Sequence, residues 1–311
     1  MVDQEPGAAD PLSLRGVVPP TVTAFHDDES VDYDRTADHA RFVVDRGVHG
    51  VFPLGTNGEF PLLSGDERDR VVTAVVEEVG DEVPVIAGVG APSTYQTVAH
   101  AEHAESVGAD GLVVVTPYYY PLDREGTLEH YRRVADAVSL PVYVYHIPSK
   151  TGNELPLETL AELAERDVVV GVKDSSKDVP WLAQAIDRNP ELTFLAGSDS
   201  LIFTGLEIGC SGAVSAVANA FPELVVECYE AFTDGDEDRA QELQSTIFDV
   251  RDAFKTGGAY MSGVKTALRM REFDVGPLRS PLRLKDDDSA AELREGLADL
   301  DGVLDGRLGS H

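Results

Sequence analysis

Cysteine and long apolar runs are the most informative absences in this chain of 311 residues. Only Cys210 and Cys228 are present, which argues against the disulfide framework of a small secreted domain. No stretch of 18 or more apolar residues occurs, and residues 1–10 combine neither a basic start nor an apolar core. We therefore expect a soluble, cytoplasmic protein with no membrane partner, and its 42% of hydrophobic residues suffice for a core.

Positive charge is the next scarcity. The chain has 25 basic against 56 acidic residues, a formal net charge of −31, and this balance argues against nucleic-acid binding because it repels phosphate. The acidic residues are dispersed rather than gathered in a tail, which resembles the surface of proteins from extremely halophilic archaea. Lysine occurs six times, as Lys150, Lys173, Lys177, Lys255, Lys265 and Lys285.

What the chain does contain is a regular series of short apolar runs. They are typical of parallel strands that helices cover on both faces. Eight such units predict an α/β fold, a (β/α)8 TIM barrel, with a doubly wound open sheet as the alternative. The runs span residues 16–25, 51–54, 83–89, 112–115, 142–145, 168–172, 193–196 and 213–217.

Between these runs, apolar residues recur at helical spacing, and Ser64 with Glu67 has the spacing of a helix-starting capping box. Beyond residue 233 the strand-like runs stop, and we predict helices at 236–254, 258–271 and 289–302. The chain thus divides into a flexible tail (1–11), a barrel domain (12–233) and a C-terminal helical extension (234–311). The helical stripes are Val72, Val75, Val76 and Val79; Leu157, Leu160, Ala161 and Ala164; and Leu128, Tyr131, Ala135 and Val138.

The candidate catalytic residues follow the apolar runs, because active sites of barrels form at the carboxyl ends of the strands. Lys173 follows the run at 168–172, where loss of hydration lowers a lysine pKa and leaves a neutral amine to attack a carbonyl. A structural ion pair with Asp174 is the alternative. Tyr145 ends another run, and residues 55–60 (GTNGEF) form a turn suited to bind a carboxylate through backbone N–H groups.

Four motifs, GTNGEFPLLS, TPYYYP, VYHIPSKTG and GVKDSS, occur in this order between residues 14 and 285. Together they resemble the dihydrodipicolinate synthase / N-acetylneuraminate lyase superfamily of pyruvate-dependent class I aldolases. The resemblance implies that Lys173 forms a Schiff base with pyruvate, that Tyr145 is the acid/base group, and that Thr56 binds the carboxylate and relays protons. It implies a homotetramer, a dimer of dimers, with Tyr119 contributed across an interface. Further implied substrate contacts are Gly55, Asn57, Lys150, Ser175, Gly197 and Val214.

The choice of substrate depends on departures from this pattern. Dihydrodipicolinate synthases carry GTTGE or GSTGE, then PYYN, then an arginine in PSRTG, where this chain has Asn57, Tyr120 and Lys150. At Lys150, the point charge of an ammonium group replaces the planar guanidinium fork of arginine. This argues against the synthase of lysine biosynthesis as the function. The run YYYP resembles archaeal 2-keto-3-deoxygluconate / 2-keto-3-deoxy-6-phosphogluconate aldolases, while GTNGEFP and KDS also resemble 4-hydroxy-2-oxoglutarate aldolase.

We predict the sugar-acid aldolase, which cleaves its substrate to pyruvate and glyceraldehyde or its 3-phosphate in an Entner–Doudoroff-type route. The phosphate-binding form of that enzyme has an arginine directly after YYYP, whereas this chain has Leu122 there and Arg124 two positions later. Phosphorylation of the substrate therefore stays open, with Lys150 as a candidate anion contact and a solvated surface lysine as the alternative.

No metal and no organic cofactor is predicted, because a lysine imine is itself the electron sink. His100 and His103, or residues 26–29 (HDDE), keep a metal-dependent class II aldolase as an alternative. A catalytically silent keto-acid-binding protein is the non-enzyme alternative, against which the combination of Lys173, Tyr145 and Thr56 argues.

Overall fold

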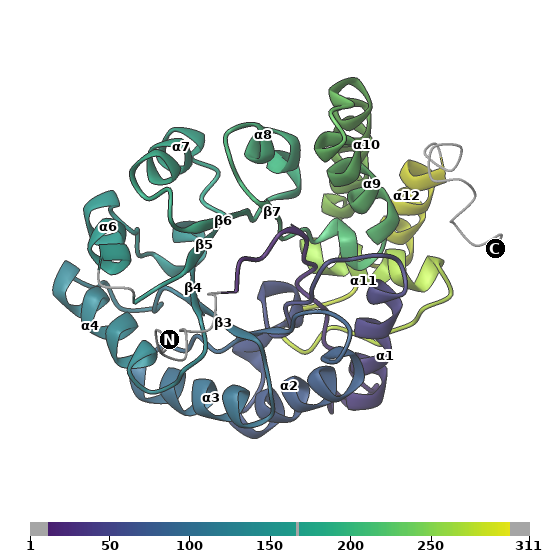
Figure 1. Ribbon diagram of the computed structural model, residues 1–311. Helices are drawn as coiled ribbons and strands as arrows, with labels where there is room; N and C mark the ends of the chain where they lie inside the picture. The colour runs from purple at the N-terminus through teal and green to yellow at the C-terminus, as the bar shows by residue number, and fades with distance from the viewer. Residues whose placement is uncertain (1–11, 166–167, 299–311) are drawn as a thin grey trace, which may run out of the picture.

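The computed structural model describes residues 12–165 and 168–298, which form a ring of parallel strands surrounded by helices (Figure 1). Seven strands form one sheet in the order β1-β7-β6-β5-β4-β3-β2, so that neighbours in the sheet are mostly neighbours in the chain. The strands are β1 (Gly16–Val17), β2 (Ile86–Gly88), β3 (Gly111–Val115), β4 (Val142–His146), β5 (Gly171–Asp174), β6 (Thr193–Ala196) and β7 (Gly212–Ala213).

The gap between β1 and β2 is closed by residues 49–53, which overlap the second predicted strand (51–54). On one side Phe52 N–H donates to the Pro19 carbonyl at 3.0 Å, and on the other the N–H groups of Ile86 and Gly88 donate to residues 51 and 53 at 3.0 and 2.9 Å. These bonds complete the circle, and the (β/α)8 TIM barrel prediction is confirmed over the doubly wound sheet.

Several strands are shorter than the apolar runs that predicted them. The run at 16–25 contains a strand of only two residues, because Pro19 and Pro20 have no N–H to donate to a ladder. Pro84 likewise delays the start of β2 to Ile86. The run at 51–54 forms only an isolated parallel bridge, Val51 to Val85. Apolar runs thus located the strands. They overestimated the hydrogen-bonded length of several, whereas β3 and β4 are each one residue longer than their runs.

The helices alternate with the strands and pack around them. Ser64 and Glu67 form the predicted capping box of α2. Of the predicted stripes, only Val138 lies outside its helix, because α4 ends at Ala135. The helices of the barrel are α1 (Tyr33–Val44), α2 (Gly65–Val79), α3 (Thr94–Ser106), α4 (Arg124–Ala135), α5 (Pro148–Thr151), α6 (Leu157–Glu165), α7 (Val179–Arg188), α8 (Ile202–Glu207) and α9 (Pro222–Thr233).

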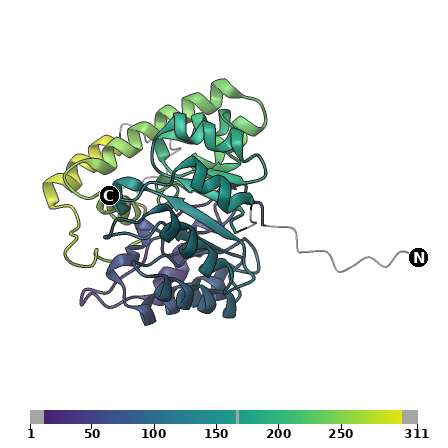
Figure 2. The same cartoon turned by 90° about the vertical axis from the view of Figure 1, so that its left-hand side faces the viewer.

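Three further helices follow the barrel: α10 (Glu237–Lys255), α11 (Tyr260–Met270) and α12 (Asp287–Ala298). They correspond to the three predicted C-terminal helices, with the end of the last prediction (299–302) outside the described residues. Coloured green to yellow, they lie together along one edge of the barrel (Figure 2). The predicted tail (1–11) also lies outside the described residues, and the division at 233/234 remains a proposal. No helix in the described ranges has the length and apolar character needed to cross a membrane.

Candidate active site

Lys173 and Tyr145 lie side by side at the carboxyl ends of neighbouring strands. They are register partners of β5 and β4. The Lys173 Nζ atom lies 3.4 Å from the centroid of the Tyr145 ring and 5.0 Å from that of Phe52. Lys173 is 3% exposed and Tyr145 is 4% exposed, so the amine and the phenol lie together in a site shielded from water.

The structural alternative for Lys173, an ion pair with Asp174, does not occur in the described part of the chain. The Asp174 carboxylate binds His146 at 2.9 Å instead. A second acid whose charge reaches the amine is Asp199, which accepts hydrogen bonds from Tyr260 at 2.7 Å and Ser215 at 2.6 Å. Lys173 is therefore a buried amine without an ion-pair partner among these residues.

Burial and charge act in opposite directions on this pair. Burial lowers the pKa of Lys173, although the charges of Tyr145, Asp199 and Asp174 partly oppose it. Burial by itself raises the pKa of Tyr145, but the charge of Lys173 and side-chain interactions with Thr56, Lys173 and Ser175 together outweigh it and lower that pKa. Both shifts favour proton exchange between these groups and the substrate: a neutral amine becomes easier to form, and so does a phenolate.

Thr56 completes the arrangement from the turn after the second apolar run. Its Oγ1 lies 3.0 Å from the Tyr145 hydroxyl, and it begins a short 3-10 helix, Thr56–Gly58. A side chain on Gly55 would lie 2.9 Å from the Phe52 ring, so close packing requires glycine there. Asn57 is buried and lines the same cavity as Lys173 and Tyr145.

The opposite wall of the cavity comes from the ends of β5, β6 and β7. Ser175 donates its hydroxyl proton to the Gly197 carbonyl at 2.8 Å, and a Cβ atom on Gly197 would lie 2.2 Å from that hydroxyl. Val214 lines the same space. Of the implied contacts, Thr56, Asn57, Tyr145, Lys150, Lys173, Ser175, Gly197 and Val214 line one cavity of about 520 Å³, whereas Gly55 lies only beside it and Tyr119 is not part of its lining.

The C-terminal helices supply cavity residues that the strand pattern did not reveal. Arg251 and Lys255 come from α10, and Tyr260 and Met261 from the start of α11. Four of the six lysines of the chain line the cavity: Lys150, Lys173, Lys177 and Lys255. The scarcity of lysine in so acidic a chain was the signal in the sequence that could have identified Lys177 and Lys255 as candidate site residues.

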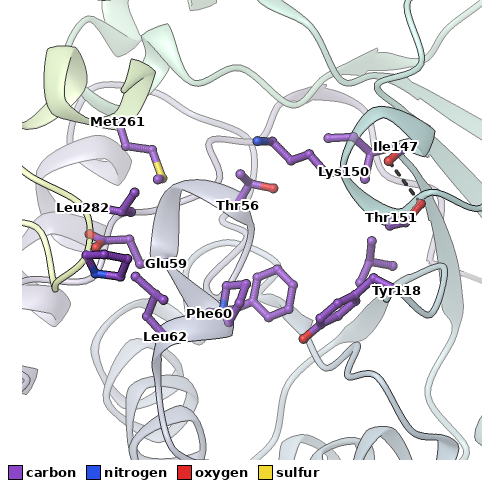
Figure 3. A pocket seen from close by; sticks show the side chains of 13 residues that line it. Thr56, Glu59, Phe60, Leu62, Tyr118, Ile147, Lys150, Thr151, Met261 and Leu282 are labelled. Carbon is purple, nitrogen blue, oxygen red and sulfur yellow. Dashed lines mark hydrogen bonds between the residues drawn. The ribbon is translucent and has the colours of Figure 1, made fainter. Parts of the chain in front are cut away.

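A second, mostly apolar hollow of about 240 Å³ adjoins the first (Figure 3). Phe60 and Tyr118 lie edge to face across it, with ring centroids 6.0 Å apart. Lys150 and Thr56 line both spaces, and the amino end of Lys150 turns toward Thr56 in Figure 3. Lys150 is exposed and lies where the two spaces meet, a placement consistent with either of its predicted interpretations.

Tyr119 is not brought to the cavity within one chain. It is 83% exposed on the loop after β3, next to Tyr120, which is 70% exposed. The two rings contact each other edge to face, with centroids 5.0 Å apart. This position is consistent with the implied role of Tyr119 in a neighbouring subunit, which remains a prediction.

The residues of the metal-dependent alternative are engaged elsewhere. His100 binds Asp69 at 2.8 Å, and His103 lies 3.1 Å from the hydroxyl of Thr73. Residues 26–29 form a turn in which His26 lies 3.6 Å from Asp32. Among residues 12–165 and 168–298, no group of three or more His, Cys, Asp or Glu side chains is arranged to hold a metal ion.

Comparison with known proteins agrees with this geometry. Residues 13–300 match the model of the dihydrodipicolinate synthetase family. An uncharacterised DapA-like lyase of Halobacterium salinarum is 73% identical, covering 96% of this chain and 98% of its own. A 4-hydroxy-tetrahydrodipicolinate synthase of Natronomonas pharaonis is 39% identical, covering 93% of this chain and 98% of its own. The crystal structure of YagE, a prophage protein of the dihydrodipicolinic acid synthase family from E. coli in complex with pyruvate, superposes with a TM-score of 0.89 at 30% identity, covering 92% and 98% of the two chains.

The names of these relatives support the dihydrodipicolinate synthase alternative better than the predicted sugar-acid aldolase. They give no support for an Entner–Doudoroff role or for carbohydrate metabolism, which stay predictions. They do support the prediction of a pyruvate-dependent lyase. The chain belongs to the dihydrodipicolinate synthetase family and is a carbon–carbon lyase.

Proposed function

We propose that the protein is a class I aldolase that binds pyruvate as a Schiff base on Lys173. The observation that carries the proposal is a buried amine which lies 3.4 Å from the Tyr145 ring and has no carboxylate partner in the described residues. Loss of hydration favours the neutral, nucleophilic amine. A neutral amine beside a phenol and a hydroxyl is the set of groups that imine chemistry needs.

In the cleavage direction, the neutral amine of Lys173 attacks the C2 carbonyl of a 2-keto acid. The Tyr145 phenol gives its proton to the departing hydroxyl, so that water leaves and an iminium and a phenolate remain. The Tyr145 phenolate then accepts the proton of the C4 hydroxyl, the C3–C4 bond breaks, and its electrons move into the iminium to form an enamine. An aldehyde departs. Protonation of the enamine at C3 and hydrolysis release pyruvate and restore the amine, with Thr56 relaying protons to Tyr145 over 3.0 Å.

The far wall of the cavity favours a substrate with a second anionic group. Lys177, Arg251 and Lys255 all line this wall. The pKa of Lys177 is lowered by burial and then by the charges of Arg251 and Lys255, so the three cations lie within reach of one another. Asp252 pairs with Arg251 and Lys255, and the charge of Asp199, which also lines the cavity, reaches Lys177. Three cations against two carboxylates still leave an excess of positive charge. In a protein of net charge −31, such a local excess indicates binding of an anion.

Two substrate classes remain, each supported by a specific observation. The names of the relatives favour 4-hydroxy-tetrahydrodipicolinate synthase, which condenses pyruvate with a semialdehyde. The side chains favour 2-keto-3-deoxy-6-phosphogluconate, because Lys150 stands where the synthases carry an arginine and the cationic wall suits a phosphate. On the geometry of the cavity we put the sugar acid first and the synthase second.

Parallel assays decide between these reactions. Pyruvate release is measured on 2-keto-3-deoxygluconate, its 6-phosphate and 4-hydroxy-2-oxoglutarate, and pyruvate consumption is measured with aspartate semialdehyde. We expect the highest kcat/KM for the 6-phosphate. Preference for aspartate semialdehyde makes the synthase the function, and no turnover on any of them favours the silent keto-acid-binding alternative.

We also propose that the enzyme assembles as a homotetramer in which Tyr119 enters the site of a neighbouring copy. Exposed aromatic side chains at Tyr119 and Tyr120, on the loop after β3, and at Tyr95, in the first turn of α3, support this proposal, because large exposed rings favour burial in an interface. Light scattering tests the assembly. A monomer with full activity would contradict it.

A further inference from the structure

The last residues of β4 and β5 carry a second pair of side chains on the face turned away from the cavity. His146 is the register partner of Asp174, one step beyond the pair Tyr145 and Lys173. Because successive side chains of a strand point to opposite faces, the outer pair lies behind the catalytic pair. Both are 3% exposed, and the His146 ring lies 4.3 Å from the Trp181 ring of α7.

Each ring nitrogen of His146 has one partner. Its Nε2 accepts the backbone N–H of Leu155 at 3.3 Å, so this nitrogen carries no proton. The proton is therefore on Nδ1, which donates to Oδ1 of Asp174 at 2.9 Å. The carboxylate also accepts the N–H and the hydroxyl of Ser176, at 3.2 and 3.0 Å. This network joins the two strand ends in one defined geometry.

We propose that His146 and Asp174 form a positioning pair that fixes the distance between Tyr145 and Lys173, a role that rests on the proposed Schiff-base function. Backbone pairing of these strands ends at the bond from Ser175 N–H to the His146 carbonyl, at 2.8 Å. The side-chain bond lies level with this last backbone bond and joins the two strand ends a second time. An apolar pair would fill the same space, but a buried hydrogen bond has a direction and specifies one register.

Fixing this distance benefits catalysis, because proton transfer tolerates only small errors in the position of the donor and the acceptor. Tyr145 must lie within hydrogen-bond reach of atoms bound to Lys173, and a misplacement of about 1 Å lowers rates by about 10²-fold. The outer pair touches no substrate, so its effect reaches the reaction only through the strand ends. It should therefore change kcat while leaving formation of the imine intact.

The test replaces both polar partners at once, in the double variant His146→Phe/Asp174→Leu. The double variant leaves neither side chain of this hydrogen bond unpaired, but the N–H groups of Leu155 and Ser176 lose their acceptors. We therefore expect some loss of stability, and kcat is measured on the folded enzyme. We expect kcat to fall by about 10- to 100-fold, with KM and the yield of borohydride-trapped pyruvate at Lys173 unchanged. A folded double variant with the wild-type kcat would overturn the proposal. Absence of trapped pyruvate in the wild-type protein would instead refute the Schiff-base function.

Two single variants decide the question if the double variant does not fold. Asp174→Asn keeps an oxygen that accepts from Nδ1, and we expect it to retain kcat within about threefold, whereas His146→Phe should lose about tenfold or more. Equal kcat in the two variants would overturn the proposal. His130→Phe is the matched control, since His130 is also buried and hydrogen-bonded, to Thr94, but does not line either cavity. It should lower stability without changing kcat.

Discussion

Two buried lysines of this protein have similar exposure and opposite surroundings. Lys265 of α11 is 1% exposed and lies 2.9 Å from Oε1 of Glu59. It also donates to the carbonyls of Thr23 and Pro277 at 2.8 Å each, so a carboxylate and two carbonyl oxygens surround the ammonium group. Lys173 is 3% exposed, has an aromatic ring beside its amine, and has no ion-pair partner in the described residues.

The comparison shows that burial alone does not identify a nucleophile. Burial lowers the pKa of both lysines, but the carboxylate and hydrogen bonds of Glu59 oppose this at Lys265. Glu59 also accepts the backbone N–H of Arg279 at 3.0 Å. Lys265 therefore ties α11 to the loop that carries Thr56, which is a structural task. Lys173 has no carboxylate partner in the described residues, so its amine is available to attack a carbonyl.

The largest expected effect is the loss of activity in Lys173→Met. Turnover should fall below detection, because no other group in the cavity can form the imine at this position. The free energy of unfolding should be unchanged or higher, since a buried amine without an ion-pair partner in the described residues is replaced by an apolar side chain of similar length. Chemical denaturation measures stability, and a pyruvate assay measures activity. Residual turnover would place the nucleophile elsewhere.

Tyr145→Phe removes the phenolic hydroxyl, which distinguishes the surroundings of Lys173 from those of Lys265. We expect turnover to fall by about 10²–10⁴-fold while the imine still forms. The charge of Tyr145 raises the pKa of Lys173. Its removal should therefore lower that pKa further and move the pH midpoint of imine trapping downward. An upward shift, or near-native turnover, would contradict this role.

Lys265→Met should reverse the pattern seen for Lys173. It leaves Glu59 buried without its cation, and breaking a buried pair from one side costs about 3–5 kcal/mol. We expect this loss in the free energy of unfolding, while the folded fraction still traps pyruvate at Lys173. Lys173→Met is the matched control for deletion of a buried amine. Equal stability of the two variants would remove the distinction between the lysines.

The smallest expected effect concerns the cationic wall. Lys177→Ala and Lys255→Ala should each raise KM for the 6-phosphate by about tenfold, the value of one charge-assisted hydrogen bond. KM for the unphosphorylated sugar acid should stay nearly constant. Lys150→Ala is the comparison variant at the junction of the two cavities. Equal effects on both substrates would separate these lysines from anion recognition.

The sequence predicted the parts of the site that local pattern encodes. Lys173, Tyr145 and Thr56 follow apolar runs, and the barrel brings the ends of those runs to one rim. It did not predict Arg251, Lys255 or Asp199 in the cavity lining, because packing of α10 against the barrel and the course of the β6 loop bring them there. Nor did any pattern predict that Lys265 is buried beside a carboxylate, since Glu59 is 206 positions before Lys265 in the chain.

The most direct test of the account is borohydride reduction in the presence of pyruvate, followed by peptide mass analysis. Reduction traps an imine as a stable amine, so the mass increase identifies the lysine that reacts. The account predicts one pyruvate-derived increment on the peptide that contains Lys173 and none on the peptide that contains Lys265. Labelling at another lysine, or no labelling of the active enzyme, would contradict it.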